Sequence, residues 1–114
     1  MAADAIGTVD GSSFDSVVLG AAGPVTVEFM SYSCAHCRAI ESALQTVSEA
    51  VGPAQKIYRV NVALEPALAS RYGVSGTPTL LMFLQGTEVA RVEGPPHEVD
   101  DLLQVVRQPF QSLA

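Results

Sequence analysis

Two cysteines, Cys34 and Cys37, stand where a predicted buried strand runs into a predicted amphipathic helix. The strand is the apolar and β-branched segment 25–30, and the helix shows apolar residues at helical spacing from residue 40 to residue 51. We therefore expect Cys34 at a helix N-terminus, where unpaired backbone N–H groups and the positive end of the helix dipole stabilise an anion. A thiol in this position should ionise more easily than a free thiol, and the thiolate is the nucleophilic form.

The spacing of the two cysteines permits a reversible disulfide. Residues three apart on a helix lie on one face with Cβ atoms roughly 5 to 6 Å apart, so a modest tightening of the turn brings them to disulfide distance. One thiolate can then attack a foreign disulfide, and the other thiol can resolve the mixed disulfide. Disulfide-stapled secreted proteins carry several distant pairs, so this single close pair indicates chemistry more than scaffolding.

The composition argues against nucleic acid as a partner. The 114 residues carry a formal net charge of −6, and the six Lys and Arg residues are scattered. The apolar run at 80–84 is far shorter than a membrane span, and the segment 1–7 lacks the basic start and apolar core of an export signal. We expect one domain over residues 1–114, no membrane partner and a cytoplasmic location.

The remaining apolar patterns and turn signals predict a mixed α/β order. Strands are expected at 6–9, 25–30, 56–62, 79–84 and 89–93, and helices at 14–19, 34–51, 66–72 and 99–106. This order predicts a mostly parallel sheet that ends in an antiparallel hairpin and has helices on both faces.

Several segments together resemble the thioredoxin family. They are the strand at 27–29, the Cys-Ala-His-Cys sequence at 34–37, the segment 72–80 with its Gly-Thr-Pro-Thr sequence, the turn at 85–86, and Gly94. The resemblance spans nearly the whole chain. It implies the thioredoxin fold, with a central mixed sheet of about five strands flanked by about four helices.

The resemblance also implies the activity of a thiol-disulfide oxidoreductase, a protein disulfide reductase with no cofactor beyond its own redox-active disulfide. Its implied partners are disulfide-containing protein substrates and a thioredoxin-reductase-like electron donor. We expect the protein to act as a monomer.

Carried over to single positions, the resemblance makes Cys34 the attacking cysteine and Cys37 the resolving one. Pro78 matches the cis-proline that lies beside the cysteine pair in the family. Because Pro78 has no N–H, it and Thr77 can present the Thr77 backbone to an extended substrate strand. Gly76 joins Thr77 as a candidate substrate-binding residue.

Glu28 lies six residues before Cys34 on a strand otherwise made for the core. A carboxylate buried there should have a raised pKa unless it is paired. In thioredoxins an aspartate at the matching place accepts the proton of the resolving cysteine, and a glutamate there is more similar to the protein disulfide isomerases. Arg59 matches a neighbouring lysine of the family, which leaves a Glu28–Arg59 pair open, as well as a Glu28 that points to solvent.

His36 replaces a proline of the thioredoxins. As an imidazolium or a hydrogen-bond donor it would stabilise the Cys34 thiolate, and a stabilised reduced form makes the disulfide a stronger oxidant. We therefore expect a potential less reducing than that of ordinary thioredoxin, and an oxidant or isomerase is the alternative function. A solvated loop histidine without effect is the other interpretation.

The chain departs from the thioredoxins at two aromatic positions as well. The tryptophan that usually precedes the first cysteine is Ser33 here, the other tryptophan position is Met30, and the chain contains no tryptophan. This opens the surface around Cys34 and puts the docking of an ordinary thioredoxin reductase in question. Tyr32 can supply the missing aromatic contact, which makes it a third substrate-binding candidate, unless it is an incidental exposed loop residue.

Two further alternatives belong to other classes of protein. A metal site could use Cys34, Cys37, His36 and His97, but His36 lies between the cysteines and His97 comes far later, on the surface near the start of the last helix, so we expect no metal. The chain could also be a thioredoxin-fold interaction module with an inert disulfide. Rapid alkylation of Cys34 near neutral pH distinguishes the oxidoreductase from such a module.

Overall fold

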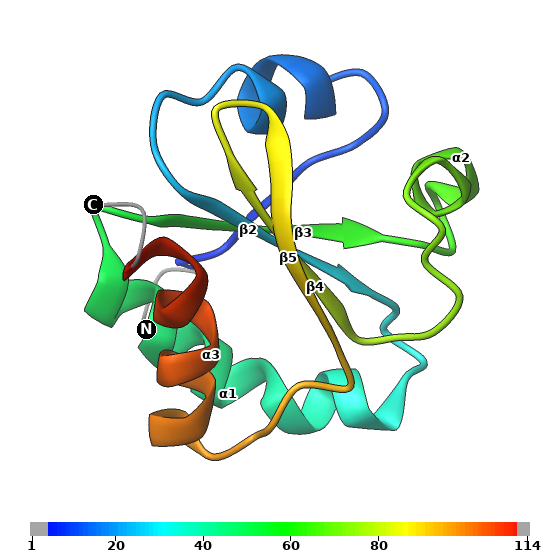
Figure 1. The fold of residues 1–114 in the computed structure, drawn as a ribbon. Coiled ribbons are helices and arrows are strands. Elements are labelled where there is room, and N and C mark those ends of the chain that lie inside the picture. Colours follow the sequence, from blue (N-terminus) through cyan, green and yellow to red (C-terminus); the bar gives the residue numbers. More distant parts are fainter. Residues whose placement is uncertain (1–4, 112–114) are drawn as a thin grey trace.

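The fold is seen in a computed structural model that describes residues 5–111. Residues 1–4 and 112–114 of the expected domain, and with them most of the segment considered for an export signal, lie outside the described residues. The described chain forms one five-stranded sheet with the order β1-β3-β2-β4-β5 (Figure 1). The strands are β1 (Gly7–Thr8), β2 (Val25–Met30), β3 (Lys56–Asn61), β4 (Thr79–Leu84) and β5 (Thr87–Glu93).

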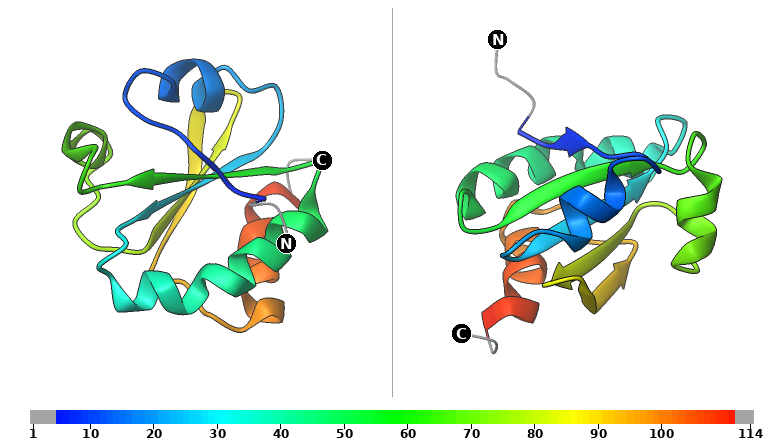
Figure 2. Two further views of the ribbon diagram at one scale, coloured as in Figure 1. Left: turned by 180° about the vertical axis from the view of Figure 1, so that it is seen from behind. Right: turned by 90° about the horizontal axis from the view of Figure 1, so that it is seen from above.

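The sheet is mixed, as the resemblance implied, but it is not mostly parallel as the element order predicted, because β4 runs antiparallel to β2 as well as to β5 and two of the four strand pairings are therefore antiparallel. Strands β1 and β2 both pair in parallel with β3, whereas β4 runs antiparallel to β2 and forms a hairpin with β5. The helices are η1 (Asp15–Leu19), α1 (Ala35–Val51), α2 (Pro66–Arg71) and α3 (Val99–Gln111). Figure 2 shows how they surround the sheet when it is viewed from behind and from above. This arrangement has the central mixed five-stranded sheet and the flanking helices that the resemblance implied.

Two apolar layers hold the helices against the sheet. One layer joins α1 and α3 to one face, and its fully buried members include Leu44, Leu80, Met82 and Leu102. The other layer joins η1 and α2 to the opposite face around Phe14, Phe29 and Phe83. Because both faces of the central strand are covered, all six residues of β2 are buried, including a threonine and a glutamate.

The structure differs from the predicted elements mainly at their ends. The first helical segment is a π-helical turn, closed by a hydrogen bond from the Gly20 N–H to the Asp15 carbonyl. Helix α3 continues past residue 106 to Gln111 and contains Pro109, because Phe110 extends the apolar face into the core. Among residues 5–111, no helix combines the length and the apolar character that crossing a membrane requires.

Candidate functional site

The two cysteines lie where β2 passes into α1. Cys34 is the N-cap of α1, with an extended backbone at φ −83° and ψ 117°, and Cys37 lies in the first helical turn. A hydrogen bond from the Cys34 N–H to the Ser31 carbonyl, 3.1 Å long, closes the turn between strand and helix. The predicted placement of Cys34 at a helix N-terminus is therefore confirmed.

The Cys34 sulfur is half-buried and hydrogen bonded on two sides. It accepts the Cys37 backbone N–H at 3.1 Å, and its thiol faces the Thr77 carbonyl at 3.5 Å. Burial raises the pKa of Cys34, but hydrogen bonding with the side chains of Cys37 and Thr77 and with the backbone N–H groups of Cys37 and His36 outweighs it, so the pKa falls below its ordinary value. These donors favour the thiolate over the thiol.

Cys37 has the opposite environment. Its side chain is buried, and burial followed by its hydrogen bond to Cys34 raises the pKa of Cys37 to about 11. Both cysteines are free thiols in this structure. The pair therefore consists of one sulfur prepared to be a thiolate and one sulfur that needs a base before it can react.

The loop before β4 lies against the cysteine pair. The peptide bond between Thr77 and Pro78 is cis, as the resemblance implied, and Pro78 is buried. The Pro78 carbonyl accepts the N–H of Gly94, 3.0 Å away, at the end of β5. Gly94 has a φ of +59°, a left-handed conformation that favours glycine. This hydrogen bond links the loop that faces Cys34 to the end of the hairpin.

Glu28 is fully buried in β2, which excludes the interpretation that it points to solvent. Within residues 5–111, neither of its carboxylate oxygens has a hydrogen-bond partner. Burial raises the pKa of Glu28 from its ordinary 4.5 to about 7, the negative charge of Glu41 adds to the rise, and the positive charge of Arg59 opposes it. Glu28 is thus a buried carboxyl group that can exchange a proton near neutral pH.

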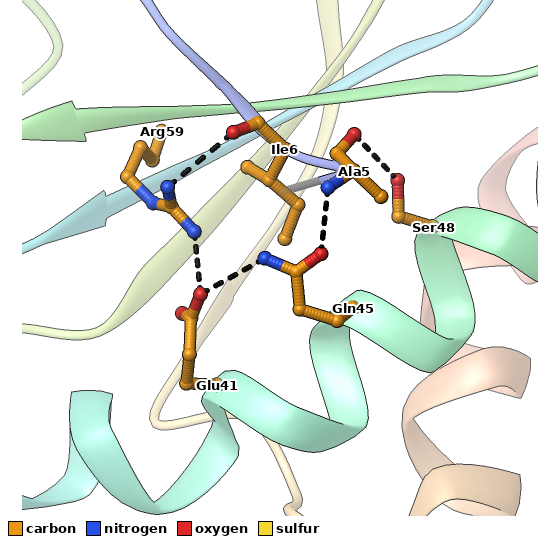
Figure 3. Close-up of polar contacts among 6 residues, drawn as sticks. All are labelled: Ala5, Ile6, Glu41, Gln45, Ser48 and Arg59. Carbon is orange, nitrogen blue, oxygen red and sulfur yellow. Dashed lines mark hydrogen bonds and ion pairs between the residues drawn. The ribbon is translucent and has the colours of Figure 1, made fainter. Parts of the chain in front are cut away.

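The cation of Arg59 is engaged elsewhere. Its Nη2 forms an ion pair with Oε1 of Glu41 on α1, at 2.5 Å, and its Nη1 donates to the Ile6 carbonyl at 3.3 Å (Figure 3). The open possibility of a Glu28–Arg59 hydrogen bond is therefore not realised. Sequence analysis missed Glu41, although its position four residues after Cys37 places both on one face of α1.

The imidazole of His36 is hydrogen bonded to the backbone near β5 and not to the Cys34 sulfur. Its Nε2 lies 3.0 Å from the Pro95 carbonyl, and its ring packs edge-on against His97 with 5.5 Å between the ring centroids. What His36 contributes to the lowered pKa of Cys34 is its backbone N–H. His97 itself is exposed shortly before α3, as expected.

The candidate substrate-binding residues divide between two pockets. Tyr32 is 63% exposed and lines a pocket with Met30, Cys37, Arg38, Glu41 and Arg59. Gly76 and Thr77 line a different pocket, together with residues of α2 and the following loop. The structure brings Thr77 to Cys34, whereas Tyr32 shares its pocket with Cys37.

The fold brings the two histidines together although they are far apart in the sequence. Even so, residues 5–111 contain no cluster of three or more His, Cys, Asp or Glu side chains that could hold a metal ion. No metal chemistry is assigned to these residues.

Comparison with known proteins gives one consistent answer. The sequence model of the family described as Thioredoxin matches residues 5–108. The chain is 37% identical over 82 residues to a thioredoxin of Rhodospirillum rubrum, covering 72% of this chain and 79% of that protein. It is 35% identical over 100 residues to a thioredoxin of Chlamydia caviae, covering 88% of this chain and 94% of that protein.

A solved structure gives the same result. A single-site mutant of a thioredoxin from Halobacterium salinarum NRC-1 superposes with a TM-score of 0.80 at 27% sequence identity. The match covers 97% of this chain and 96% of that one, so it extends over the whole fold and not only over the cysteine motif.

Proposed function

Because this chain belongs to the thioredoxin family, whose members are thiol-disulfide oxidoreductases that use their own cysteines, we propose that it reduces disulfides in protein substrates through Cys34 and Cys37. The observation that carries the proposal is the opposite acidity of two sulfurs one helical turn apart, with the pKa of Cys34 lowered and the pKa of Cys37 raised. This asymmetry supports Cys34 as the attacking cysteine and Cys37 as the resolving one.

The first step is the attack of the Cys34 thiolate on a substrate disulfide. A bond forms between the Cys34 sulfur and one substrate sulfur, the substrate S–S bond breaks, and the second substrate sulfur leaves as a thiolate. Thr77 and Gly76 would align an extended substrate strand, since the Thr77 carbonyl already lies against the Cys34 sulfur. Tyr32, exposed in the loop before the motif, would contact the substrate protein.

The second step is the release of the substrate. Cys37 transfers its proton to the Glu28 carboxylate, and the resulting Cys37 thiolate attacks the Cys34 sulfur of the mixed disulfide. The Cys34–Cys37 disulfide forms and the reduced substrate leaves as a thiolate. A base is needed because a thiol whose pKa is about 11 is almost wholly protonated at neutral pH.

The cycle closes when a thioredoxin-reductase-like donor supplies two electrons and returns both cysteines to thiols. We propose a cytoplasmic location, since redox-cycling dithiols, more than structural disulfides, are the cysteine chemistry of that compartment. A monomer suffices for every step, because both sulfurs and the base belong to one chain.

A second candidate function is a disulfide oxidant or isomerase. The hydrogen bonds from Cys37 and His36 that favour the Cys34 thiolate support it, since they stabilise the reduced form and make the disulfide more oxidising. We propose a potential less reducing than that of ordinary thioredoxin, and its value decides the physiological direction.

The test is the pH dependence of alkylation of the reduced protein by iodoacetamide, with mass mapping of the modified cysteine. Cys34 should react first, with a midpoint below its ordinary pKa of 9.0. The Cys37→Ser variant should retain a reactive Cys34 but accumulate mixed disulfides with protein substrates. A Cys34 that titrates like an ordinary free thiol would leave the fold without the activity.

A further inference from the structure

The buried carboxyl of Glu28 and the guanidinium of Arg59 are neighbours that do not bind each other. The two residues are directly opposite in the parallel pairing of β2 with β3, so their side chains leave the sheet on the same face. Arginine next to a buried carboxylate usually forms a bidentate ion pair. Here neither Glu28 oxygen finds a hydrogen-bond partner in the described part of the chain, although Arg59 lies opposite Glu28 on the next strand.

Glu41 on helix α1 competes with Glu28 for the Arg59 guanidinium. Oε1 of Glu41 receives both Nη2 of Arg59 and, at 3.1 Å, the side-chain amide of Gln45. Gln45 is fixed in turn by the backbone N–H of Ala5 at 2.8 Å (Figure 3). Because the Glu41 side chain is 40% exposed whereas Glu28 is fully buried, ionised Glu41 costs far less desolvation and holds the cation more readily.

The ion pair borders the resolving cysteine. One pocket of about 320 Å³ is lined by Glu41, Arg59 and Cys37, so the Glu41–Arg59 ion pair and the resolving cysteine border the same space. We propose that Glu41 is a positioning residue that holds Arg59 away from the Glu28 carboxyl and so keeps that carboxyl free to exchange a proton with Cys37. This inference rests on the proposed role of Glu28 as the base for Cys37.

The charges that act on Glu28 set the expected direction of the change in its pKa. Glu41 raises the pKa of Glu28, Arg59 lowers it, and the charge of Cys34 raises it. From the other side of β2, the residue opposite Glu28 on β4 is the apolar Leu80. Removing Glu41 takes away a negative charge and one of the groups that hold the Arg59 guanidinium, so Arg59 can turn toward Glu28 about its contact with the Ile6 carbonyl, and both changes lower the pKa of Glu28.

A lower pKa of Glu28 has two measurable consequences for the resolution step. The acid limb of its pH profile moves to lower pH, because the basic form of Glu28 persists there. At pH 8, where Glu28 is ionised in either protein, the rate falls because a weaker base removes the Cys37 proton less readily.

Four variants test the inference in the reduced protein: Glu41→Ala, Glu41→Gln, Glu49→Gln and Glu28→Gln. The alanine removes both the charge and the acceptor, the glutamine keeps an acceptor for Arg59, and Glu49→Gln removes one exposed charge elsewhere on α1 as the matched control. The Glu28 carboxyl is titrated by ¹³C NMR, with Glu28→Gln identifying its signal. Resolution is followed by stopped flow as thionitrobenzoate release from a mixed disulfide formed on Cys34.

The midpoint of the Glu28 titration should fall by about one pH unit in Glu41→Ala, by less in Glu41→Gln, and not measurably in Glu49→Gln. The midpoint of the resolution profile should move by the same amount, and the rate at pH 8 should drop about threefold if the proton-transfer sensitivity is near one half.

Equal shifts in Glu41→Ala and Glu49→Gln, or no shift in either, would overturn the positioning role while leaving Glu28 as the base. If Glu28→Gln resolves the mixed disulfide at the wild-type rate across the pH range, the proposed function of Glu28 fails instead. The two failures are therefore distinguishable.

Discussion

Replacement of Glu28 by glutamine should stabilise the protein at alkaline pH but not at acid pH. The carboxyl is fully buried and has no hydrogen-bond partner among residues 5–111, so its ionised form is costly in the folded state. Unfolding returns Glu28 to its ordinary pKa of 4.5 from about 7. Between these values the folded protein binds more protons than the unfolded chain, so the free energy of unfolding falls as pH rises through this interval.

The magnitude follows from the width of that interval. About 2.5 pH units between 4.5 and 7, at about 1.4 kcal/mol per unit, give about 3 kcal/mol that wild type loses between pH 4 and pH 8. Glutamine has nearly the same shape and does not ionise, so Glu28→Gln should not show this loss. For a domain of this size, 3 kcal/mol corresponds to a difference of roughly 10 °C in Tm.

The assay is guanidinium unfolding of both reduced proteins from pH 4 to pH 8, followed by circular dichroism because the chain has no tryptophan to report by fluorescence. The gap in unfolding free energy between Glu28→Gln and wild type should widen by about 3 kcal/mol toward pH 8. Glu49→Gln, which removes an exposed carboxylate from α1, should give a curve parallel to wild type. A constant gap between Glu28→Gln and wild type from pH 4 to pH 8 would refute the reasoning.

Two further predictions concern the motif and the core. His36→Pro removes the backbone N–H that favours the Cys34 thiolate, so the reduction potential measured by glutathione equilibration should become more negative by roughly 30 to 60 mV, the equivalent of one charge-assisted hydrogen bond. The control His36→Ala keeps this N–H and should shift the potential less. An unchanged potential in His36→Pro would contradict the argument. Leu44→Ala creates a cavity beneath α1 and should lower the free energy of unfolding by about 2 to 5 kcal/mol without moving the alkylation midpoint of Cys34. A loss of stability below about 1 kcal/mol would show that α1 is not packed against the sheet as described.

The parts of the site that local sequence determines were predictable. The run of apolar and β-branched residues located β2, and the helical repeat from Ile40 to Val51 located α1, so the amino-acid sequence was enough to place Cys34 at their junction. Glu28 on a strand otherwise made for the core predicted a buried carboxyl, and the structure confirms its burial. Each of these inferences uses only neighbours along the chain.

The partners of charged groups were not predictable in the same way. Glu28 lies beside Arg59 in the sheet and Glu41 lies across from it on α1, and the sequence does not give the spacing between helix and strand that decides which carboxylate Arg59 binds. The contact of His36 with His97 likewise depends on where the turn after β5 returns the chain, far along the sequence. Such contacts depend on tertiary packing, which single-sequence patterns do not report.

The asymmetry of the cysteine pair follows from two separate causes, and this bears on how the site can be altered. Cys34 owes its lowered pKa to hydrogen bonds with the Cys37 side chain, with Thr77 and with the backbone N–H groups at the helix start, whereas Cys37 owes its high pKa first to burial. Substitutions in the cysteine motif, such as His36→Pro, should therefore act mainly on the reactivity of Cys34. Changes at Glu28, Glu41 or Arg59 should act mainly on the reactivity of Cys37. The attack depends on Cys34 and the release on Cys37, so each step has its own set of side chains to alter, but the hydrogen bond between the two cysteine side chains makes the pKa of each depend on the other.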